Sequence, residues 1–129
     1  MSHLDFIRKA VQLANDNPRQ YGGPHGAVIV KNGEIISIGV NEEYLSNDPT
    51  AHAETLAVRK ACQHLNTSDL SGCVIYASTE PCPMCLSAIT YAKIESIYYA
   101  NRGSDSIENV YRRLLERAVE MVRLESTDS

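Results

Sequence analysis

The segment AHAETLAVRKACQHLNTSDLSGCVIYASTEPCPMCLSAITYAKIESIYYA, residues 51–100, alternates between helix-forming and strand-forming stretches. Strong helix formers fill residues 51–65. A second helix is expected over residues 82–93, where a proline lies in the first turn and its missing N–H costs nothing. The apolar runs at residues 73–78 and 96–100 predict strands. Helices that alternate with strands predict an α/β fold.

The residues before this segment predict a helix and a β-hairpin. Apolar side chains recur at helical spacing at Leu4, Ile7, Val11 and Ala14. The Ser2 hydroxyl can cap this helix while Asp5 completes a capping box, and the helix should end before Asn17. Residues 26–31 and 34–40 are rich in β-branched side chains and flank an Asn-Gly pair, so we expect two antiparallel strands.

The residues after this segment predict one more helix and one more strand. A continuous apolar stripe behind Ser106 is made of Ile107, Val110, Tyr111, Leu114, Leu115 and Ala118. Residues 119–124 are expected to close the sheet as a fifth strand. Because neither an internal repeat nor a linker is visible, we expect a single domain over residues 1–129, with a mixed five-stranded sheet and helices on both of its faces.

Composition and charge narrow the possible functions. A chain of 129 residues with 43% hydrophobic and 22% charged residues has the size and composition of one globular domain. It contains no apolar run near the ~20 residues of a membrane span and no secretory signal at its start, so we expect a cytoplasmic protein without a membrane partner. The net charge of -4 leaves no broad basic field for phosphates, which argues against nucleic acid as a partner.

The four cysteines are candidates for a metal site, because thiols in a chain without a secretory signal are more often metal ligands or buried groups than disulfides. Cys62 and Cys73 lie among apolar neighbours and are expected in the core. Cys82 and Cys85 are spaced i, i+3 on the opening turn of a predicted helix, and His52 lies at the opening turn of another. A redox Cys-x-x-Cys, or buried thiols with an incidental histidine, is the alternative interpretation.

One histidine and two cysteines can hold one Zn²⁺ and leave its fourth tetrahedral position open to water, which is the arrangement of a catalytic zinc. Two thiolates and a neutral imidazole cancel the charge of the ion, so the water needs a further group to remove and return its proton. Glu54 is the candidate, because its side chain leans toward the same helix end as that of His52. Unpaired N–H groups at both helix starts favour thiolates and hydroxide there.

The pair His52-Ala53-Glu54 and Pro81-Cys82-x-x-Cys85 resembles the signature of the zinc-dependent cytidine-deaminase-like superfamily. Residues 22–28, 47–54 and 80–85 resemble bacterial guanine deaminases in particular, and the shared motifs are also similar to those of tRNA adenosine deaminases. The resemblance implies a three-layer α/β/α sandwich, an active homodimer, one zinc per chain and hydrolytic removal of an exocyclic amine as ammonia.

The resemblance also implies contacts to the base. Asn41 falls where such enzymes use an asparagine to hold the base, and the backbone N–H of Ala53 would face the ring carbonyl. His25 occupies a position where guanine deaminases usually have phenylalanine, and we expect it to line the pocket. Guanine deaminases carry a longer stretch that closes over the base. Asp105 and Tyr111 are the nearby candidates for that role here, although Tyr111 also belongs to the apolar stripe.

The sequence therefore predicts a zinc-dependent hydrolytic deaminase of a small nucleobase or related aminoheterocycle, with guanine first. One alternative is adenosine deamination in tRNA, which shares the motifs but calls for a basic surface, so the acidity of this chain argues against it. A second is deamination of cytosine or isocytosine. A third is a non-catalytic zinc domain used for interactions, which the presence of Glu54 and the open fourth position argue against.

Overall fold

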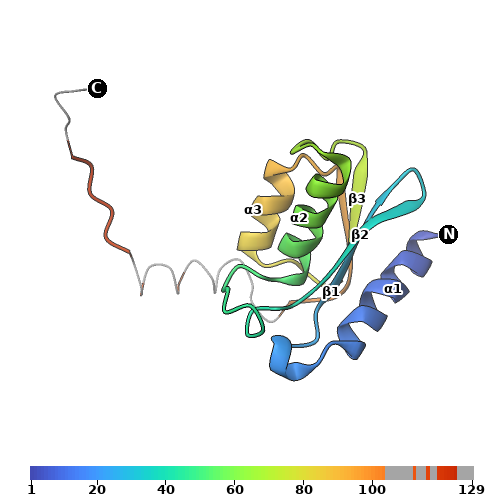
Figure 1. Cartoon of the computed structure of the whole chain (residues 1–129), viewed down its shortest axis with the longest axis horizontal. Coiled ribbons are helices and arrows are strands. Elements are labelled where there is room, and N and C mark those ends of the chain that lie inside the picture. The colour runs from blue at the N-terminus through green and yellow to red at the C-terminus, as the bar shows by residue number, and fades with distance from the viewer. Residues whose placement is uncertain (104–111, 113–115, 117–118, 125–129) are drawn as a thin grey trace.

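The computed structural model describes residues 1–103, 112, 116 and 119–124 (Figure 1). In chain order its elements are α1 (His3–Asp16), the 3₁₀ helix η1 (Arg19–Tyr21), β1 (Gly26–Lys31), β2 (Glu34–Val40), α2 (Ala53–Leu65), β3 (Cys73–Thr79), α3 (Pro83–Tyr91) and β4 (Ser96–Asn101). The strands form one sheet in the order β2-β1-β3-β4. β1 runs antiparallel to both of its neighbours, whereas β3 and β4 are parallel, so the sheet is mixed.

Helices cover both faces of the sheet, with α1 on one face and α2 and α3 on the other (Figure 1). The buried cluster under α1 comprises Phe6, Ala10, Val28, Val30 and Tyr76. The buried cluster under α2 and α3 comprises Ala27, Ile29, Ala53, Ala57, Ala61, Leu70, Cys73, Ile75, Ile89 and Ala92. Cys62 packs against this second cluster, so Cys62 and Cys73 both contribute to the core as expected. The three layers confirm the predicted fold class.

The first helix forms where the capping signal predicts it. The Ser2 hydroxyl accepts the backbone N–H of Asp5 at 3.2 Å, and the Asp5 carboxylate accepts the backbone N–H of Ser2 at 2.8 Å. The expected apolar face is wrong in one detail, because Leu4 is 55% exposed. The buried face consists instead of Phe6, Ala10 and Ala14. The helix is rotated this way because the Phe6 ring packs against Tyr76, with 5.0 Å between the ring centroids.

The first turn of α2 lies close against the hairpin formed by β1 and β2. Asn32 and Gly33 have φ angles of 52° and 77°, as a type I′ turn requires, which confirms the predicted hairpin. In β2, a Cβ atom at Gly39 would collide with the carbonyl oxygen of Ala53, so only glycine lets the start of α2 lie so close.

The ends of three strands meet at one edge of the sheet. Gly26 at the start of β1 lies opposite Val40 at the end of β2, and Ala27 lies opposite Ala77 near the end of β3. The residues that precede β1 and follow β2 and β3 are therefore neighbours in space, although they are far apart in the sequence. The functional site lies at this edge.

The C-terminal region differs from the prediction. Residues 119–124 form no strand and are exposed, with Met121 94% exposed, so the sheet has four strands rather than five in the described part of the chain. An apolar stretch can form a strand only where a neighbouring edge supplies backbone partners, and its sequence does not specify that edge. Asp105, Tyr111 and almost all of the helix expected behind Ser106 lie outside the described residues. None of the helices that the structure describes has the length and apolar character needed to cross a membrane.

Candidate metal centre and active site

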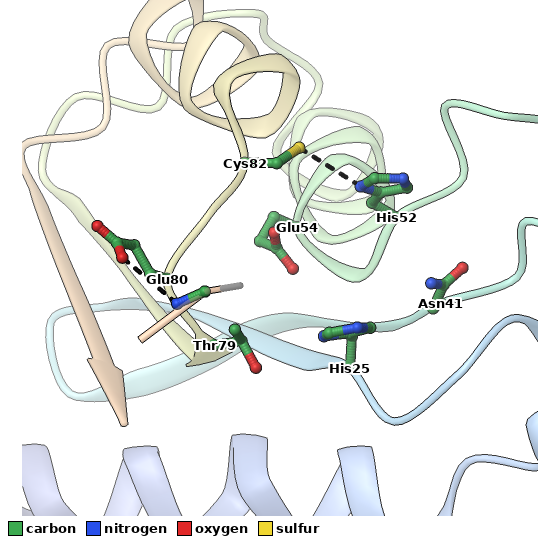
Figure 2. Close-up of a pocket in the computed structure, with 8 residues that line it drawn as sticks. His25, Asn41, His52, Glu54, Thr79, Glu80 and Cys82 are labelled. Atoms are coloured by element: carbon green, nitrogen blue, oxygen red, sulfur yellow. Dashed lines mark hydrogen bonds between the residues drawn. The ribbon is translucent and has the colours of Figure 1, made fainter. Parts of the chain in front are cut away.

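A cavity of about 140 Å³ lies at the sheet edge where β1 begins and where β2 and β3 end (Figure 2). Its lining residues are His25, Asn41, His52, Glu54, Thr79, Glu80, Cys82 and Gly103. They come from the strand ends and from the starts of α2 and α3. Pockets for drug-sized ligands enclose about 300–1,000 Å³, so this smaller cavity suits a compact ligand such as a single heterocycle.

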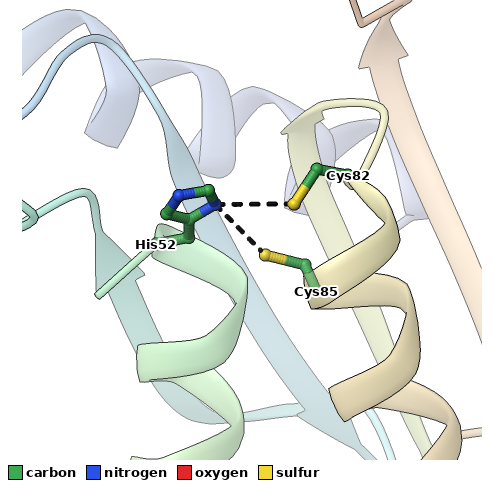
Figure 3. A group of neighbouring side chains, drawn as sticks. All are labelled: His52, Cys82 and Cys85. Atoms are coloured by element: carbon green, nitrogen blue, oxygen red, sulfur yellow. Dashed lines mark hydrogen bonds between the residues drawn. The ribbon is translucent and has the colours of Figure 1, made fainter. Parts of the chain in front are cut away.

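The loop before α2 fixes the backbone of His52. The Asp48 carboxylate accepts both the N–H and the hydroxyl of Thr50, at 2.8 and 2.7 Å, in a turn that aspartate favours. The Thr55 hydroxyl donates to the carbonyl of Thr50 and accepts the backbone N–H of His52 at 3.1 Å. His52 is therefore held directly before the first turn of α2, and its side chain projects toward α3 (Figure 3).

His52, Cys82 and Cys85 face one another across the starts of α2 and α3 (Figure 3). The Nδ1 atom of His52 lies 3.6 Å from the sulfur of Cys82 and 3.5 Å from that of Cys85. Tetrahedral zinc, with Zn–N bonds of about 2.0–2.1 Å and Zn–S bonds of about 2.3 Å, separates a nitrogen and a sulfur ligand by about 3.6 Å. The donor set and its spacing therefore fit zinc, and this is the one cluster of three metal-ligating side chains among the residues that the structure describes.

The two thiols of this cluster differ in acidity. The neighbouring Cys85 thiol, with the help of His52, lowers the pKa of Cys82 to about 4. The Cys82 sulfur, together with burial, raises the pKa of Cys85. The bond between His52 and the Cys82 sulfur raises the pKa of His52. A cation bound here would remove the proton from either thiol, because coordination deprotonates a thiol outright.

Glu54 is buried beside this cluster. It is the second residue of α2, its exposed fraction is 7%, and it lines the same cavity as His52 and Cys82 (Figure 2). Burial raises the pKa of its carboxyl group above the ordinary value. A carboxyl group whose pKa moves toward neutrality accepts and returns a proton more readily at the pH of the cell. The arrangement can therefore transfer protons next to a metal ion.

Asn41 lies at the cavity but already makes structural hydrogen bonds. It follows β2 and is 6% exposed. Its Oδ1 atom accepts the backbone N–H of Glu43 at 2.9 Å, and its Nδ2 atom donates to the carbonyl of Gly22 at 3.2 Å. A side-chain amide has two hydrogens and two acceptor sites, so one donor and one acceptor position of Asn41 are still available to a ligand.

His25 lines the cavity, whereas Ala53, between His52 and Glu54, is not among its lining residues. Burial, with a smaller effect from the neighbouring His52, lowers the pKa of the His25 imidazole. His25 is therefore neutral at pH 7 and presents one donor and one acceptor nitrogen. The side chain of Ala53 is fully buried. Only its backbone can serve a ligand, because the N–H of a first-turn residue has no partner within the helix.

Further residues complete the site. Glu80, the first residue of the motif at residues 80–85, lines the cavity, and its carboxylate accepts the backbone N–H of Gly103 at 3.4 Å. Thr79 also lines the cavity and was not predicted, although its position directly before that motif could have indicated it. The Glu43 carboxylate lies 3.5 Å from the Nε2 atom of His52. No sequence signal indicates Glu43, because it is one acidic residue in a polar loop.

Comparison with known proteins agrees with this geometry. Residues 1–101 match the family model of the cytidine and deoxycytidylate deaminase zinc-binding region. A guanine deaminase from Bacillus subtilis (strain 168) is 50% identical over 109 residues, which are 84% of this chain and 70% of that protein. A tRNA-specific adenosine deaminase from Aquifex aeolicus (strain VF5) is 49% identical over 95 residues, which are 74% of this chain and 63% of that protein.

The fold of the chain is also similar to that of a solved structure. The X-ray structure of guanine deaminase from Bacillus subtilis superposes with a TM-score of 0.88 and 42% sequence identity, and the match covers 99% of this chain and 88% of that one. The chain is thus a homologue of guanine deaminase and is also related to tRNA adenosine deaminases. It belongs to the cytidine and deoxycytidylate deaminase family of zinc-dependent hydrolytic enzymes.

Proposed function

We propose that this chain hydrolyses the exocyclic amine of a free nucleobase, with guanine as the first candidate substrate, and that residues 1–129 form a single zinc-dependent deaminase domain. The observation that carries the proposal is the buried carboxylate of Glu54 in one small cavity with the metal cluster. The 50% identity to a guanine deaminase supports guanine over other bases. The cavity has a size that suits a single base.

The residues divide the chemistry between them. Zinc held by His52, Cys82 and Cys85 would supply Lewis-acid activation of a water molecule. Glu54 carries one proton from the water to the ring nitrogen as the oxygen adds to the carbon that bears the amine. Glu54 then carries a second proton from the added hydroxyl group to the amine, so that the C–N bond breaks. Ammonia leaves, and the oxygen remains as a ring carbonyl.

Three groups are proposed to hold the base against this centre. Asn41 offers the remaining donor and acceptor positions of its amide, and Ala53 offers its backbone N–H to the ring carbonyl. His25 also lines the wall, as a neutral imidazole that can pair with a polar edge of a purine or stack on its face. These contacts orient the reacting carbon toward Glu54.

Adenosine deamination in tRNA is the second candidate, because an Aquifex aeolicus tRNA-specific adenosine deaminase is 49% identical to this chain. The net charge of -4 argues against it, since recognition of an RNA backbone rests on basic side chains. Deamination of cytosine or isocytosine would use the same centre with a smaller base. A non-catalytic zinc domain would have no need of a buried carboxylate beside its metal.

We further propose that the chain acts as a homodimer in the cytoplasm. Helix α3 exposes apolar side chains, with Leu86 38% and Tyr91 86% exposed, and Met121 in the C-terminal region is 94% exposed. Burying such groups against a second copy stabilises an assembly. The free thiols of the metal cluster suit a reducing compartment. Light scattering at micromolar concentration should give twice the mass of 14.2 kDa, and a monomer mass would contradict the dimer.

An ammonia-release screen tests the reaction. The zinc-loaded protein is offered guanine, cytosine, isocytosine, adenine, their nucleosides and aminotriazines, and in parallel a tRNA anticodon stem-loop. The Glu54→Gln variant at equal zinc content is the control for contaminating deaminases. We expect the fastest release from guanine. Faster conversion of adenosine in the stem-loop than of every small base would overturn the proposal in favour of the tRNA activity.

A further inference from the structure

The imidazole of His52 is contacted at both of its nitrogens. Its Nδ1 atom faces the sulfurs of Cys82 and Cys85, at 3.6 and 3.5 Å. Its Nε2 atom lies 3.5 Å from the Oε1 atom of Glu43. Among the residues that the structure describes, His52 is the only side chain that forms an ion pair or hydrogen bond with this carboxylate. Glu43 thus lies on the side of the ring opposite the metal cluster.

The backbone of Glu43 is held in place rather than free to move with the loop. Its N–H donates to the Oδ1 atom of Asn41 at 2.9 Å, and its carbonyl accepts the N–H of Asp48 at 3.0 Å. Asn41 is in turn fixed to Gly22 at 3.2 Å through its Nδ2 atom. The main-chain carbonyl of Asn41 accepts the side-chain amide of Asn17 at 3.0 Å. A series of hydrogen bonds therefore supports Glu43 beside the ring.

The chemistry of a metal-bound histidine explains this placement. A histidine that binds through Nδ1 must carry its proton on Nε2, and a carboxylate that accepts that proton in a hydrogen bond fixes both the tautomer and the ring orientation. We propose that Glu43 is a positioning residue of the zinc site, whose carboxylate accepts the Nε2–H of His52 and holds Nδ1 toward the metal. This inference rests on the zinc ligands of the proposed function, but it does not depend on which substrate is deaminated.

Zinc affinity measured by competition with a chromophoric chelator tests the inference. Loss of such an outer partner typically weakens metal affinity 10- to 100-fold, so Glu43→Ala should raise the zinc Kd by that factor. Glu43→Gln keeps an acceptor oxygen without the charge, so its Kd should lie between those of Glu43→Ala and the unaltered protein. Glu42→Ala is the matched control. It removes the same charge from the adjacent residue, whose side chain makes no hydrogen bond or ion pair with any described residue, and its Kd should stay within twofold of that of the unaltered protein.

Thermal unfolding of the metal-free proteins separates positioning from a general structural role. All three variants should unfold within a few degrees of the unaltered protein without zinc, and only the Glu43 variants should gain less stability when zinc is added. A Glu43→Ala protein that binds zinc within twofold of the unaltered Kd would overturn the inference. A Glu42→Ala protein whose zinc affinity is weakened as much as that of Glu43→Ala would also overturn the inference. Neither measurement needs a substrate, so failure of the guanine assay would leave this result standing, and the reverse also holds.

Discussion

Replacing Glu54 by glutamine is the sharpest perturbation of the proposed chemistry. The substitution keeps the shape of a side chain that is only 7% exposed and removes its ability to carry a proton. Proton transfer by a positioned side chain contributes about 10²- to 10⁴-fold to a rate, which corresponds to about 3–5 kcal/mol of transition-state stabilisation. Because one carboxylate serves both the attacking water and the departing amine, we expect a loss toward the upper end of this range.

Zinc content should not change in this variant, because the proposed nitrogen and sulfur ligands are His52, Cys82 and Cys85. Elemental analysis and ammonia release are measured on the same preparation, with Glu42→Gln as a control of equal charge change. Full zinc with activity within tenfold of the unaltered protein would refute the role of Glu54. Loss of zinc would show that Glu54 also contributes to zinc binding.

The Glu54→Gln substitution should also change how the free energy of unfolding depends on pH. Burial raises the pKa of Glu54 in the folded protein above its ordinary value of 4.5, so the folded state binds this proton more tightly than the unfolded state. The favourable contribution of the protonated carboxyl is present below pH 4.5 and is lost as the pH rises through the raised pKa. Without metal, Glu54→Gln should therefore gain stability relative to the unaltered protein across that window. Denaturant unfolding at several pH values measures this difference.

Four further outcomes are expected. Cys82→Ala should lose zinc and stability together, and a full zinc complement by elemental analysis would show that the ligands are assigned wrongly. In metal-free protein the Cys82 thiolate should form with a pKa of about 4, seen as ultraviolet thiolate absorbance that Cys82→Ala removes; absorbance that appears only near pH 9 would contradict the geometry. His25→Phe should change the preference among small bases in the ammonia screen at unchanged zinc content, and an identical substrate profile would show that His25 does not contact the base. Gly39→Ala should destabilise the fold by about 1–3 kcal/mol in urea unfolding, because the added Cβ meets the backbone of Ala53; no loss of stability would mean that α2 can move away freely.

Much of the fold could be predicted from short patterns. The capping box of Ser2 and Asp5 starts α1, and the pair Asn32 and Gly33 turns the hairpin, because both signals act through bonds or dihedral angles within a few residues. The apolar face of α1 was predicted less well, since periodicity allows several rotations and the Phe6 contact with Tyr76 selects one. The strand expected at residues 119–124 is absent, because strand formation depends on a partner edge that lies elsewhere in the chain.

The sequence by itself indicated the candidate metal donors, the carboxylate beside them and the helix starts that present them, because each motif is local and its spacing sets its geometry on a helix. Only the tertiary structure decided that the two motifs meet with Nδ1 to sulfur distances of 3.5 and 3.6 Å. It also decided that Asn41 supports the backbone of Glu43 and that Glu43 lies beside His52. The physical reason is that these contacts join a loop after β2 to the starts of two helices. Their relative positions are set by the pairing of the strands and by the close packing of α2 on Gly39.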